Sequence, residues 1–370
     1  MTGPLSTLRV VEFAAIGPVP LAGQLLADMG ADVIVIDRAS APADKTDVNR
    51  RGKRSVALNL KTPGGLEIAR KLISASDILI EGHRPGVMER LGLGPKDCPP
   101  ELVYGRMTGW GQEGPLAQTA GHDINYLAMT GALHAMGRAD NPPTPPLNLV
   151  ADYGGGAMFL LFGVLAAVIE RQSSGRGQVV DAAMVDGVPA MMGLLHGLLA
   201  QGEMLNQREA NWLDGAAPFY RCYTCADGKY ISVGALEPQF YAALLKGLDL
   251  PDTTEQYDRA SWPAQTDVFA ARFATRSRDA WMEVFEGTDA CVASVLDFEE
   301  APEHPANAAR DIFIKTDGVW QARAAPRFSR SVVKSPEAPT AAGDETDTLL
   351  QELGYTAADI AGFRTEGSLT

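Results

Sequence analysis

The stretch "LRVVEFAAIGPVPLAGQLLADMGADVIVIDR", residues 8–38, decides the fold because it holds two apolar strands around one helix. Residues 8–14 and 31–38 are short and rich in β-branched side chains, which is typical of buried strands. Between them, residues 20–30 carry apolar side chains at the helical spacing of about 3.6 residues. Strand, helix and strand in this order form a βαβ unit, so the sequence predicts a parallel sheet.

The same alternation of strands and helices continues toward residue 190. Apolar strands are predicted at residues 55–60, 78–83 and 102–108, and helices at residues 64–77 and 154–178. The last helix is strongly apolar and is expected to be buried and to end at Gly175. The pattern therefore predicts a large α/β domain with a mostly parallel sheet.

A second, smaller α+β domain is predicted after this one. Residues 219–236 have strand composition with a hairpin turn at Asp227-Gly228, and helices are expected from there to about residue 310. Residues 335–347 are rich in proline and small polar residues, which is typical of a linker, and the final helical segment is expected to return to the first domain. The predicted boundaries are a large domain at residues 1–190 and 330–370, a helical connector at 191–220, the small domain at 221–310 and a return connector at 311–329.

The composition limits the class of protein. A formal net charge of −14 over 370 residues argues against a general nucleic-acid or anionic-membrane surface, because both depend on excess lysine and arginine. The four cysteines are scattered and suit a reducing compartment, and Cys222 and Cys225 are expected to be two side chains of one strand. No secretory pattern is visible and the longest apolar run is about a dozen residues, so we expect a soluble, cytoplasmic protein that is not in a membrane.

Several common catalytic motifs are absent from the sequence. It contains no G-x-S-x-G, P-loop or H-E-x-x-H pattern, which argues against the usual hydrolases, NTPases and zinc proteases. The turn after the first strand lacks the glycine fingerprint of dinucleotide folds, and the motif at Gly109, Gly111 and Gly114 precedes Pro115 and a loop. We therefore interpret that motif as a turn and expect neither a nucleotide cofactor nor a metal.

The stretch "TAGHDINYLAMTG", residues 119–131, sets a histidine and an aspartate where a polar loop meets an apolar periodic run. One interpretation is structural: Asp123 would be an ordinary acidic residue at the start of a helix, and His122 would be incidental. The other is functional: free amides at the helix start would hold a developing negative charge while His122 moves a proton. These residues alone leave both interpretations open.

Basic residues are concentrated between residues 37 and 61 of this otherwise acidic chain. They are Arg38, Arg50, Arg51, Lys53, Arg54 and Lys61. The cluster is either a solvated charge run or, since it follows a strand of the predicted parallel sheet, a site for a phosphate-bearing ligand.

A set of longer motifs resembles the α-methylacyl-CoA racemases of the class III CoA-transferase family over nearly the whole chain. The motifs, in order, are "RGKRSVALNLK", "RPGVMERLGLGP", "RMTGWGQEGP", "AGHDINYLAMTG", "PLNLVADYGGG", "GRGQVVDAAMVDG" and "VGALEPQFY". The resemblance weakens after about residue 330, and "DACVASVL" has Ser294 where family members usually carry proline. It implies an interlocked homodimer whose subunits each have a large Rossmann-like domain, formed by both chain ends, and a smaller domain between them. It places the active sites between the large domain of one subunit and the small domain of the other.

The resemblance also implies roles for particular residues. His122 and Asp152 fall on the catalytic acid/base positions, and Glu237 falls on the carboxylate that assists the histidine. The positions that fall on CoA contacts are Arg38, Leu58, Asn59, Leu60, Lys61, Gly82, His83, Arg84, Arg90, Gly121, Asp123 and Tyr126.

The chemistry implied by the family is the interconversion of (R)- and (S)-2-methylacyl-CoA thioesters. A proton leaves the α-carbon on one face and another returns on the opposite face through an enolate, so two opposed groups are needed, and His122 and Asp152 can fill these roles. The Asp123 backbone N–H is our expected donor to the enolate oxygen. The alternative is a CoA-transferase of the same family, in which Asp152 attacks the acyl-CoA and forms a mixed anhydride without need of His122.

Other residues near these motifs have competing interpretations. Taken alone, Asp152 before a glycine-rich helix start would be a helix N-cap, and Glu237 would be a surface carboxylate. Gly154–Gly156 are expected to let the thioester approach the backbone closely. Six methionines could contact the acyl chain, with Met191 and Met192 expected ahead of Met129, Met136, Met158 and Met184, although core packing is the more common use of methionine.

Overall fold

A computed structural model describes residues 3–252, 256–333, 335 and 337–370. The chain divides into two compact units. The first contains residues 1–130, 147–191 and 306–370, and the second contains residues 131–146 and 192–305. The domain boundaries expected from the sequence remain a prediction, and each unit is described here by itself.

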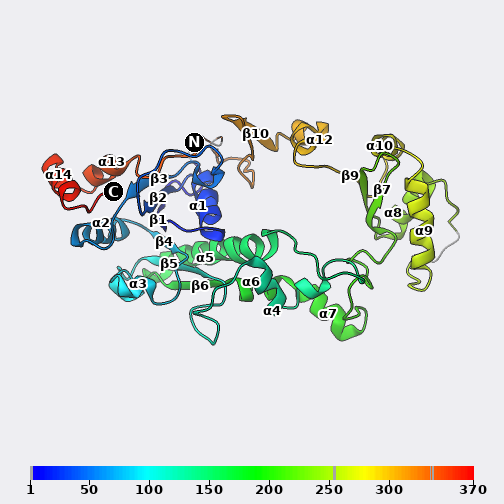
Figure 1. Cartoon of the computed structure of the whole chain (residues 1–370), viewed down its shortest axis with the longest axis horizontal. Coiled ribbons are helices and arrows are strands. Elements are labelled where there is room, and N and C mark those ends of the chain that lie inside the picture. Colours follow the sequence, from blue (N-terminus) through cyan, green and yellow to red (C-terminus); the bar gives the residue numbers. More distant parts are fainter. Residues whose placement is uncertain (1–2, 253–255, 334, 336) are drawn as a thin grey trace. The chain divides into compact units, whose positions relative to one another are not determined.

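The first unit is built on a six-stranded parallel sheet (Figure 1). Its strands are β1 (Arg9–Phe13), β2 (Asp32–Asp37), β3 (Arg54–Ala57), β4 (Ile78–Glu81), β5 (Val103–Thr108) and β6 (Val179–Ala183). They are ordered β3-β2-β1-β4-β5-β6, which is the strand order of the Rossmann fold. The predicted α/β class and parallel sheet are confirmed.

Helices cover both faces of this sheet, so its strands are buried on both sides. Successive side chains of a strand point to opposite faces: Val11 and Phe13 belong to a core shared with α2 (Pro63–Ser74), α13 (Thr346–Glu352) and α14 (Ala357–Thr365). On the other face α1 (Pro18–Asp28) packs against β1 and β2, and α5 (Met158–Ser174) packs against β5 and β6. The C-terminal helices therefore complete the first unit.

A buried ion pair holds α1 on the sheet. The Lys53 ammonium lies 2.6 Å from Glu12 Oε2 on β1 and donates to the Pro20 carbonyl in the first turn of α1 at 2.9 Å. Burial raises the pKa of Glu12 and lowers that of Lys53, while the attraction between the two charges opposes both shifts. A Cβ at Gly23 would lie 1.7 Å from Glu12 Oε2, so only glycine lets α1 approach this pair.

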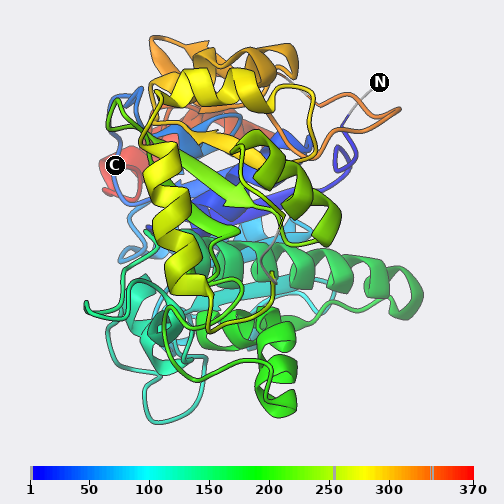
Figure 2. The ribbon, with the colours of Figure 1, turned by 90° about the vertical axis from the view of Figure 1, so that its right-hand side faces the viewer.

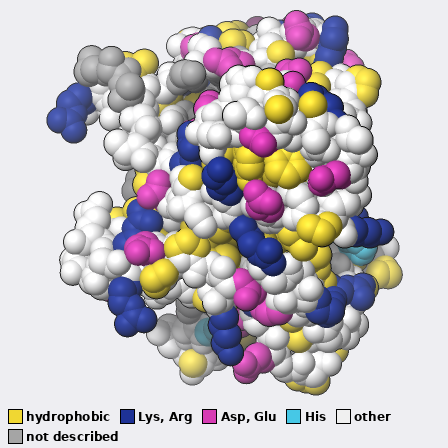
Figure 3. All heavy atoms as spheres, turned by 90° about the vertical axis from the view of Figure 1, so that its left-hand side faces the viewer, with side chains coloured by type: hydrophobic (Ala, Val, Ile, Leu, Met, Phe, Trp, Pro, Cys, Tyr) yellow, Lys and Arg dark blue, Asp and Glu magenta, His cyan; other side chains and the backbone are white. Residues whose placement is uncertain are grey.

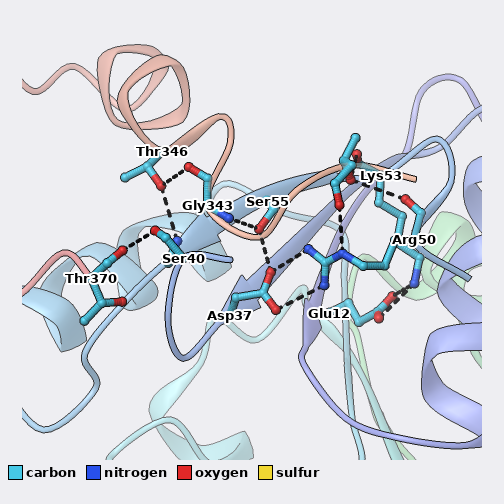
Figure 4. Close-up of polar contacts among 11 residues, drawn as sticks. Glu12, Asp37, Ser40, Arg50, Lys53, Ser55, Gly343, Thr346 and Thr370 are labelled. Atoms are coloured by element: carbon cyan, nitrogen blue, oxygen red, sulfur yellow. Dashed lines mark hydrogen bonds and ion pairs between the residues drawn. The ribbon is translucent and has the colours of Figure 1, made fainter. Parts of the chain in front are cut away.

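A second polar network ties the C-terminal segment to the sheet (Figure 4). Asp37, at the end of β2, accepts hydrogen bonds from Arg50 Nη2 at 2.7 Å and Ser55 Oγ at 2.6 Å. Ser55 Oγ in turn accepts the Gly343 N–H at 2.7 Å. Because residues 339 and 342 also form bridges with residues 51 and 41, the described part of the expected linker at 335–347 is bound to the first unit. The linker prediction is therefore wrong there; Pro336 lies outside the described residues.

Most of the basic cluster is used inside the fold. Arg50 pairs with Asp37, Arg51 pairs with buried Asp28 at 2.7 Å, Lys53 pairs with Glu12, and Arg54 pairs with Glu345 and Glu352 at 2.8 and 2.6 Å. Only Arg38 and Lys61 of the six have exposed side chains outside any ion pair of the described residues. On the face shown in Figure 3, basic and acidic side chains are likewise interspersed.

The second unit has a three-stranded antiparallel sheet of β7 (Tyr220–Thr224), β8 (Tyr230–Gly234) and β9 (Val292–Val295). Gly228 has a φ of 77° and donates its N–H to Cys225, which confirms the predicted hairpin turn. The helices of this unit are α7 (Gly193–Gln201), α8 (Pro238–Gly247), α9 (Trp262–Phe273), α10 (Arg278–Phe285) and α11 (Glu300–Glu303). Helix α9 lies beside the sheet (yellow in Figure 2), over an aromatic core that includes Tyr223 and Phe273 stacked at 5.0 Å.

Three strands between residues 290 and 322 were not predicted. Strand β9 lies in a region where only helices were expected, and β10 (Phe313–Thr316) pairs with β11 (Val319–Ala322) in the expected return connector. Helix α12 (Pro305–Ala309), in the region where helices were expected, precedes this hairpin. The strands have only four residues each, so their periodicity is too short to be recognised from the sequence.

The long apolar helix of the first unit is only partly buried. Gly175, with a φ of 72°, ends α5 as predicted. The preceding segment extends the helical stretch to Leu149–Ser174, which is long and apolar enough to cross a membrane, with 44% of its most apolar window buried. Core helices of soluble proteins pass the same test. Met158, Phe162 and Ile169 remain more than half exposed, so the prediction that this helix is buried is wrong for one face of α5 in the single chain.

The buried pair generates a stability prediction. We expect Lys53→Ala to lower the free energy of unfolding by about 3–5 kcal/mol, because the Glu12 carboxylate would remain buried without its partner. The double variant Glu12→Gln/Lys53→Met should recover most of this loss. Thermal and denaturant unfolding measure both effects. The control is Arg364→Ala, which breaks the exposed pair with Asp347 and should cost less than about 1 kcal/mol; equal effects of Lys53→Ala and the control would contradict the prediction.

Candidate active site

A cavity of about 600 Å³ opens at the carboxyl edge of the parallel sheet. It is lined by the segments that follow β1 (residues 16–19) and β4 (residues 82–85) and by the carboxyl end of β5 with the segment that follows it (residues 107–110). Residues 117 and 119–122, Tyr126, Asp152 and Met184 also line it. Strands β1 and β4 are neighbours whose following segments run in opposite directions along the sheet, which is where α/β sheets bind ligands.

His122 stands at the start of α4 (Asp123–Met129) and lines this cavity with an exposed side chain. Its backbone is extended, with φ −132° and ψ 172°, and its N–H donates to Asn125 Oδ1 at 3.0 Å. Asn125 donates its own N–H back to the His122 carbonyl at 2.8 Å. The helix start therefore fixes the backbone of His122 and leaves its imidazole at the cavity.

Asp152 lies in a π-helical segment, η4 (Leu149–Ala157), that leads directly into α5. It is inside this segment, so the interpretation of Asp152 as the N-cap of an α-helix is wrong. Burial raises the pKa of Asp152 and the charge of Asp123 raises it further, while His122 and a hydrogen bond from Asn148 act in the opposite direction. π-Helical segments are rare and are often found at functional sites.

The Asp123 side chain connects these two residues. It is 6% exposed, and its Oδ2 accepts the N–H groups of Ala151 and Asp152, both at 2.8 Å. The simple structural interpretation of Asp123 as an acidic residue that serves only its own helix is therefore wrong. Its carboxylate holds η4 beside α4, which brings His122 and Asp152 to one cavity.

Glycines near Asp152 serve two purposes: an unusual backbone conformation at Gly17 and close backbone packing at Gly155 and Gly187. Gly17 precedes α1 with a φ of 76°, a conformation that favours glycine, and a Cβ there would be in ordinary contact with Asp152 Oδ2 at 3.6 Å. A Cβ at Gly187 in α6 (Met184–Met191) would lie 1.9 Å from the Gly155 carbonyl, and one at Gly155 would lie 2.8 Å from Val188. Gly155 therefore serves the packing of η4 against α6, rather than the approach of a ligand that was expected for Gly154–Gly156.

Several of the residues expected to contact CoA line one or both of two cavities. Arg38, Gly82 and His83 line a second cavity of about 650 Å³ beside the turns after β1, β2 and β4. The two cavities share Ile16, Gly82 and His83, so they are contiguous. Arg84, Gly121 and Tyr126 line the first cavity. Asp123 is buried behind it.

The remaining expected residues lie outside both cavities. Leu58, Asn59, Leu60 and Lys61 follow β3, and the Asn59 backbone N–H donates to the Ser368 carbonyl near the C-terminus at 2.9 Å. Their contacts with CoA remain a prediction. Arg90 ends α3 (Val87–Arg90). Glu237 is exposed at the start of α8 in the second unit, so its role beside His122 remains a prediction.

Trp110 lines the first cavity but received no role from the sequence; Met184, one of the methionines less expected to contact the acyl chain, lines it too. The Trp110 ring meets the Tyr126 ring edge-on at 4.8 Å, and Cβ atoms at Gly109 and Gly121 would overlap the Tyr126 ring. The motif "RMTGWGQEGP" was the available signal for Trp110. Met184 lines the cavity, whereas Met191 and Met192 do not.

A metal centre is not indicated by the side chains of the described residues. Among them, no group of three or more histidine, cysteine, aspartate or glutamate side chains could hold a metal ion. The expectation that the reaction needs no metal stays a prediction.

Comparison with known proteins identifies the family. The model of CoA-transferase family III matches residues 5–346. Alpha-methylacyl-CoA racemase of Mus musculus is 43% identical over 364 residues, covering 96% of this chain and 95% of that protein, and the Homo sapiens protein of the same name is 40% identical over 368 residues, with the same coverage. The crystal structure of a CAIB/BAIF family protein from Brucella suis superposes with a TM-score of 0.82 at 26% identity, covering 95% of this chain and 100% of that one. With the family model spanning most of its length, the chain belongs to CoA-transferase family III.

Proposed function

We propose that this protein is an isomerase that interconverts (R)- and (S)-2-methylacyl-CoA thioesters. The observation that carries the proposal is the meeting of two acid/base groups, His122 and Asp152, at one cavity. The two racemases that are 43% and 40% identical over nearly the whole chain support the same function.

The proposed reaction moves one proton off the α-carbon and another onto its opposite face. One group, neutral His122 or ionised Asp152, takes the α-proton, and the electron pair of the C–H bond becomes the enolate. The other group, in its protonated form, then donates a proton to the same carbon from the other side. The raised pKa of Asp152 brings its carboxyl closer to histidine in acidity, which favours sharing a single proton between the two groups.

The enolate oxygen needs a hydrogen-bond donor, and we propose the Asp123 backbone N–H for this role. The first N–H groups of a helix lack partners inside it, and Asp123 directly follows His122 at the start of α4. Glu237 is proposed to bond to the His122 imidazole, orient the ring and raise its basicity.

We propose that Arg38 binds the anionic part of CoA. Its guanidinium is exposed, lines the second cavity and is in no ion pair of the described residues. Because this cavity is contiguous with the one that holds His122 and Asp152, a long thioester could extend through both. Guanidinium groups bind phosphate oxygens through charge-assisted hydrogen bonds.

We also propose the interlocked homodimer. The exposed apolar side chains of Met158, Phe162 and Ile169 along α5 support it, because monomeric proteins rarely expose large apolar patches. A second copy of this chain would remove these side chains from water. We further propose that the protein acts in the cytoplasm.

The first prediction concerns the two acid/base groups. His122→Ala and Asp152→Asn should each lower inversion of a 2-methylacyl-CoA by ~10²–10⁴-fold, because each face of the α-carbon needs its own group. Incubation of each epimer in heavy water, followed by NMR, measures both inversion and deuterium at the α-carbon.

The matched control for this experiment is His134→Ala, which removes another histidine that lies outside the cavity and should leave both rates unchanged. A CoA-transferase would give the opposite pattern: His122→Ala would be nearly silent, no deuterium would enter, and turnover would need an added carboxylic acid. That pattern would replace the proposed function by the mixed-anhydride alternative at Asp152.

The second prediction concerns CoA binding. Arg38→Ala should chiefly raise KM and leave kcat nearly unchanged, because an anion-binding group far from the α-carbon stabilises substrate and transition state alike. Lys61→Ala should act in the same direction but less, since Lys61 lies outside both cavities. Steady-state kinetics measure the split, with Arg364→Ala as a control for loss of an exposed arginine. A fall in kcat alone would show that the assignment of Arg38 is wrong.

The third prediction is that no added cofactor is needed. Dialysis against EDTA, without addition of metal or nucleotide, should leave kcat within experimental error of its starting value, because proton transfer between side chains requires neither. Restoration of lost activity by a divalent metal would contradict this expectation.

A further inference from the structure

The start of η4 has backbone N–H groups that its own helical bonds do not satisfy. The first N–H groups of any helical segment lack partners within it. Here those of Ala151 and Asp152 donate to Asp123 Oδ2, a side chain 28 and 29 positions earlier in the chain. A carboxylate from another helix therefore caps η4 at the residue that carries the catalytic carboxyl.

The same carboxylate places a negative charge beside Asp152. Asp123 is 6% exposed, and its second oxygen, Oδ1, is buried with no hydrogen-bond partner. Burial raises the pKa of Asp152 first, and the Asp123 charge raises it further. Burying a carboxylate with an unsatisfied oxygen costs stability, which favours a functional role for the negative charge of Asp123.

Other groups around Asp152 complete its electrostatic environment. His122 and Asn148 lower its pKa, and Tyr126, whose own pKa is raised by burial, Asp152 and Asp123, lies on the cavity wall. His83 and Arg84 face the same cavity from the turn after β4. The starts of α1 and α6 contribute only Gly17, Pro18, Val19 and Met184 to that wall. Asp123 is thus the one acidic group among these neighbours.

We propose that the Asp123 side chain is a positioning residue for Asp152: it fixes the turn that presents the Asp152 carboxyl to the cavity, and its negative charge favours the protonated form of that carboxyl. This inference rests on the proposed racemase function, and it goes beyond the enolate contact, which uses only the backbone N–H of Asp123. A purely structural cap would stabilise η4 without any influence on the ionisation of Asp152.

Two substitutions separate these two effects. Asp123→Asn keeps an oxygen that can accept both N–H groups but removes the charge, so the pKa of Asp152 should fall. The acidic limb of the kcat/KM profile, where activity is lost as Asp152 becomes protonated, should then move to lower pH. Asp123→Ala removes both the cap and the charge, and inversion should fall about 10- to 100-fold through misplacement of Asp152.

Exchange of the α-proton gives a second readout. In Asp123→Ala, the epimer whose α-proton faces His122 should still exchange that proton with heavy water but invert slowly. The epimer whose α-proton faces Asp152 should no longer exchange it. The control is Thr356→Ala, which removes the side-chain cap of α14, a hydrogen bond of 3.2 Å to the Asp359 N–H, away from the cavity. It should lower the melting temperature while leaving the pH profile and the exchange ratio of the two epimers unchanged.

Direct titration of Asp152 makes the test independent of turnover. The full chain is labelled with ¹³C at the aspartate carboxyls, and the Asp152 signal is assigned by its loss in Asp152→Asn. We expect its midpoint to move to lower pH in Asp123→Asn. An unmoved midpoint together with an unmoved acidic limb would overturn the inference while the racemase function stood. A wild-type protein without α-proton exchange would instead overturn the function, and an unmoved midpoint would still refute the electrostatic role of Asp123.

Discussion

The reversal of strand order between β1 and β4 is the constraint on which the rest of the structure depends. The chain first builds β1, β2 and β3 outward in one direction and then β4, β5 and β6 in the other. The turns that leave β1 and β4 therefore diverge, and no crossover helix fills the space between them. Both cavities share residues of these two turns, so the candidate site for a long thioester follows directly from the topology.

Buried carboxylates then place the elements that surround this edge. Glu12 holds the first turn of α1 through Lys53, Asp37 holds the segment after β2 through Arg50, and Asp123 holds η4 through two backbone N–H groups. Each such group is costly to bury unless it is paired or hydrogen-bonded. The polar groups therefore determine which elements pack together. The apolar core shared by the sheet, α2, α13 and α14 contributes buried hydrophobic surface.

The same architecture can support two kinds of chemistry, and the cavity wall distinguishes them. A single half-buried carboxylate at Asp152, lining the cavity close to Gly17, would be enough for a nucleophile that forms a mixed anhydride. Inversion at carbon needs a second acid/base group, and His122 supplies one at the same cavity. Asp123 links the two because its backbone follows His122 while its side chain binds the turn of Asp152. The racemase assignment thus depends on α4 and η4 being held together.

The sequence by itself determined the parallel sheet, the end of α5 at Gly175 and the turn at Asp227-Gly228, because strand periodicity and glycine conformation are local properties. Its motifs also named His122 and Asp152. Only the tertiary structure decided which charges are free: Arg54 pairs with Glu352, 298 positions away, and Asp123 binds the turn of Asp152. It also showed that Gly155 packs against Gly187 and that residues 339 and 342 are bound to the sheet domain. Such pairings depend on how elements distant in the chain pack against one another, which local sequence patterns do not determine.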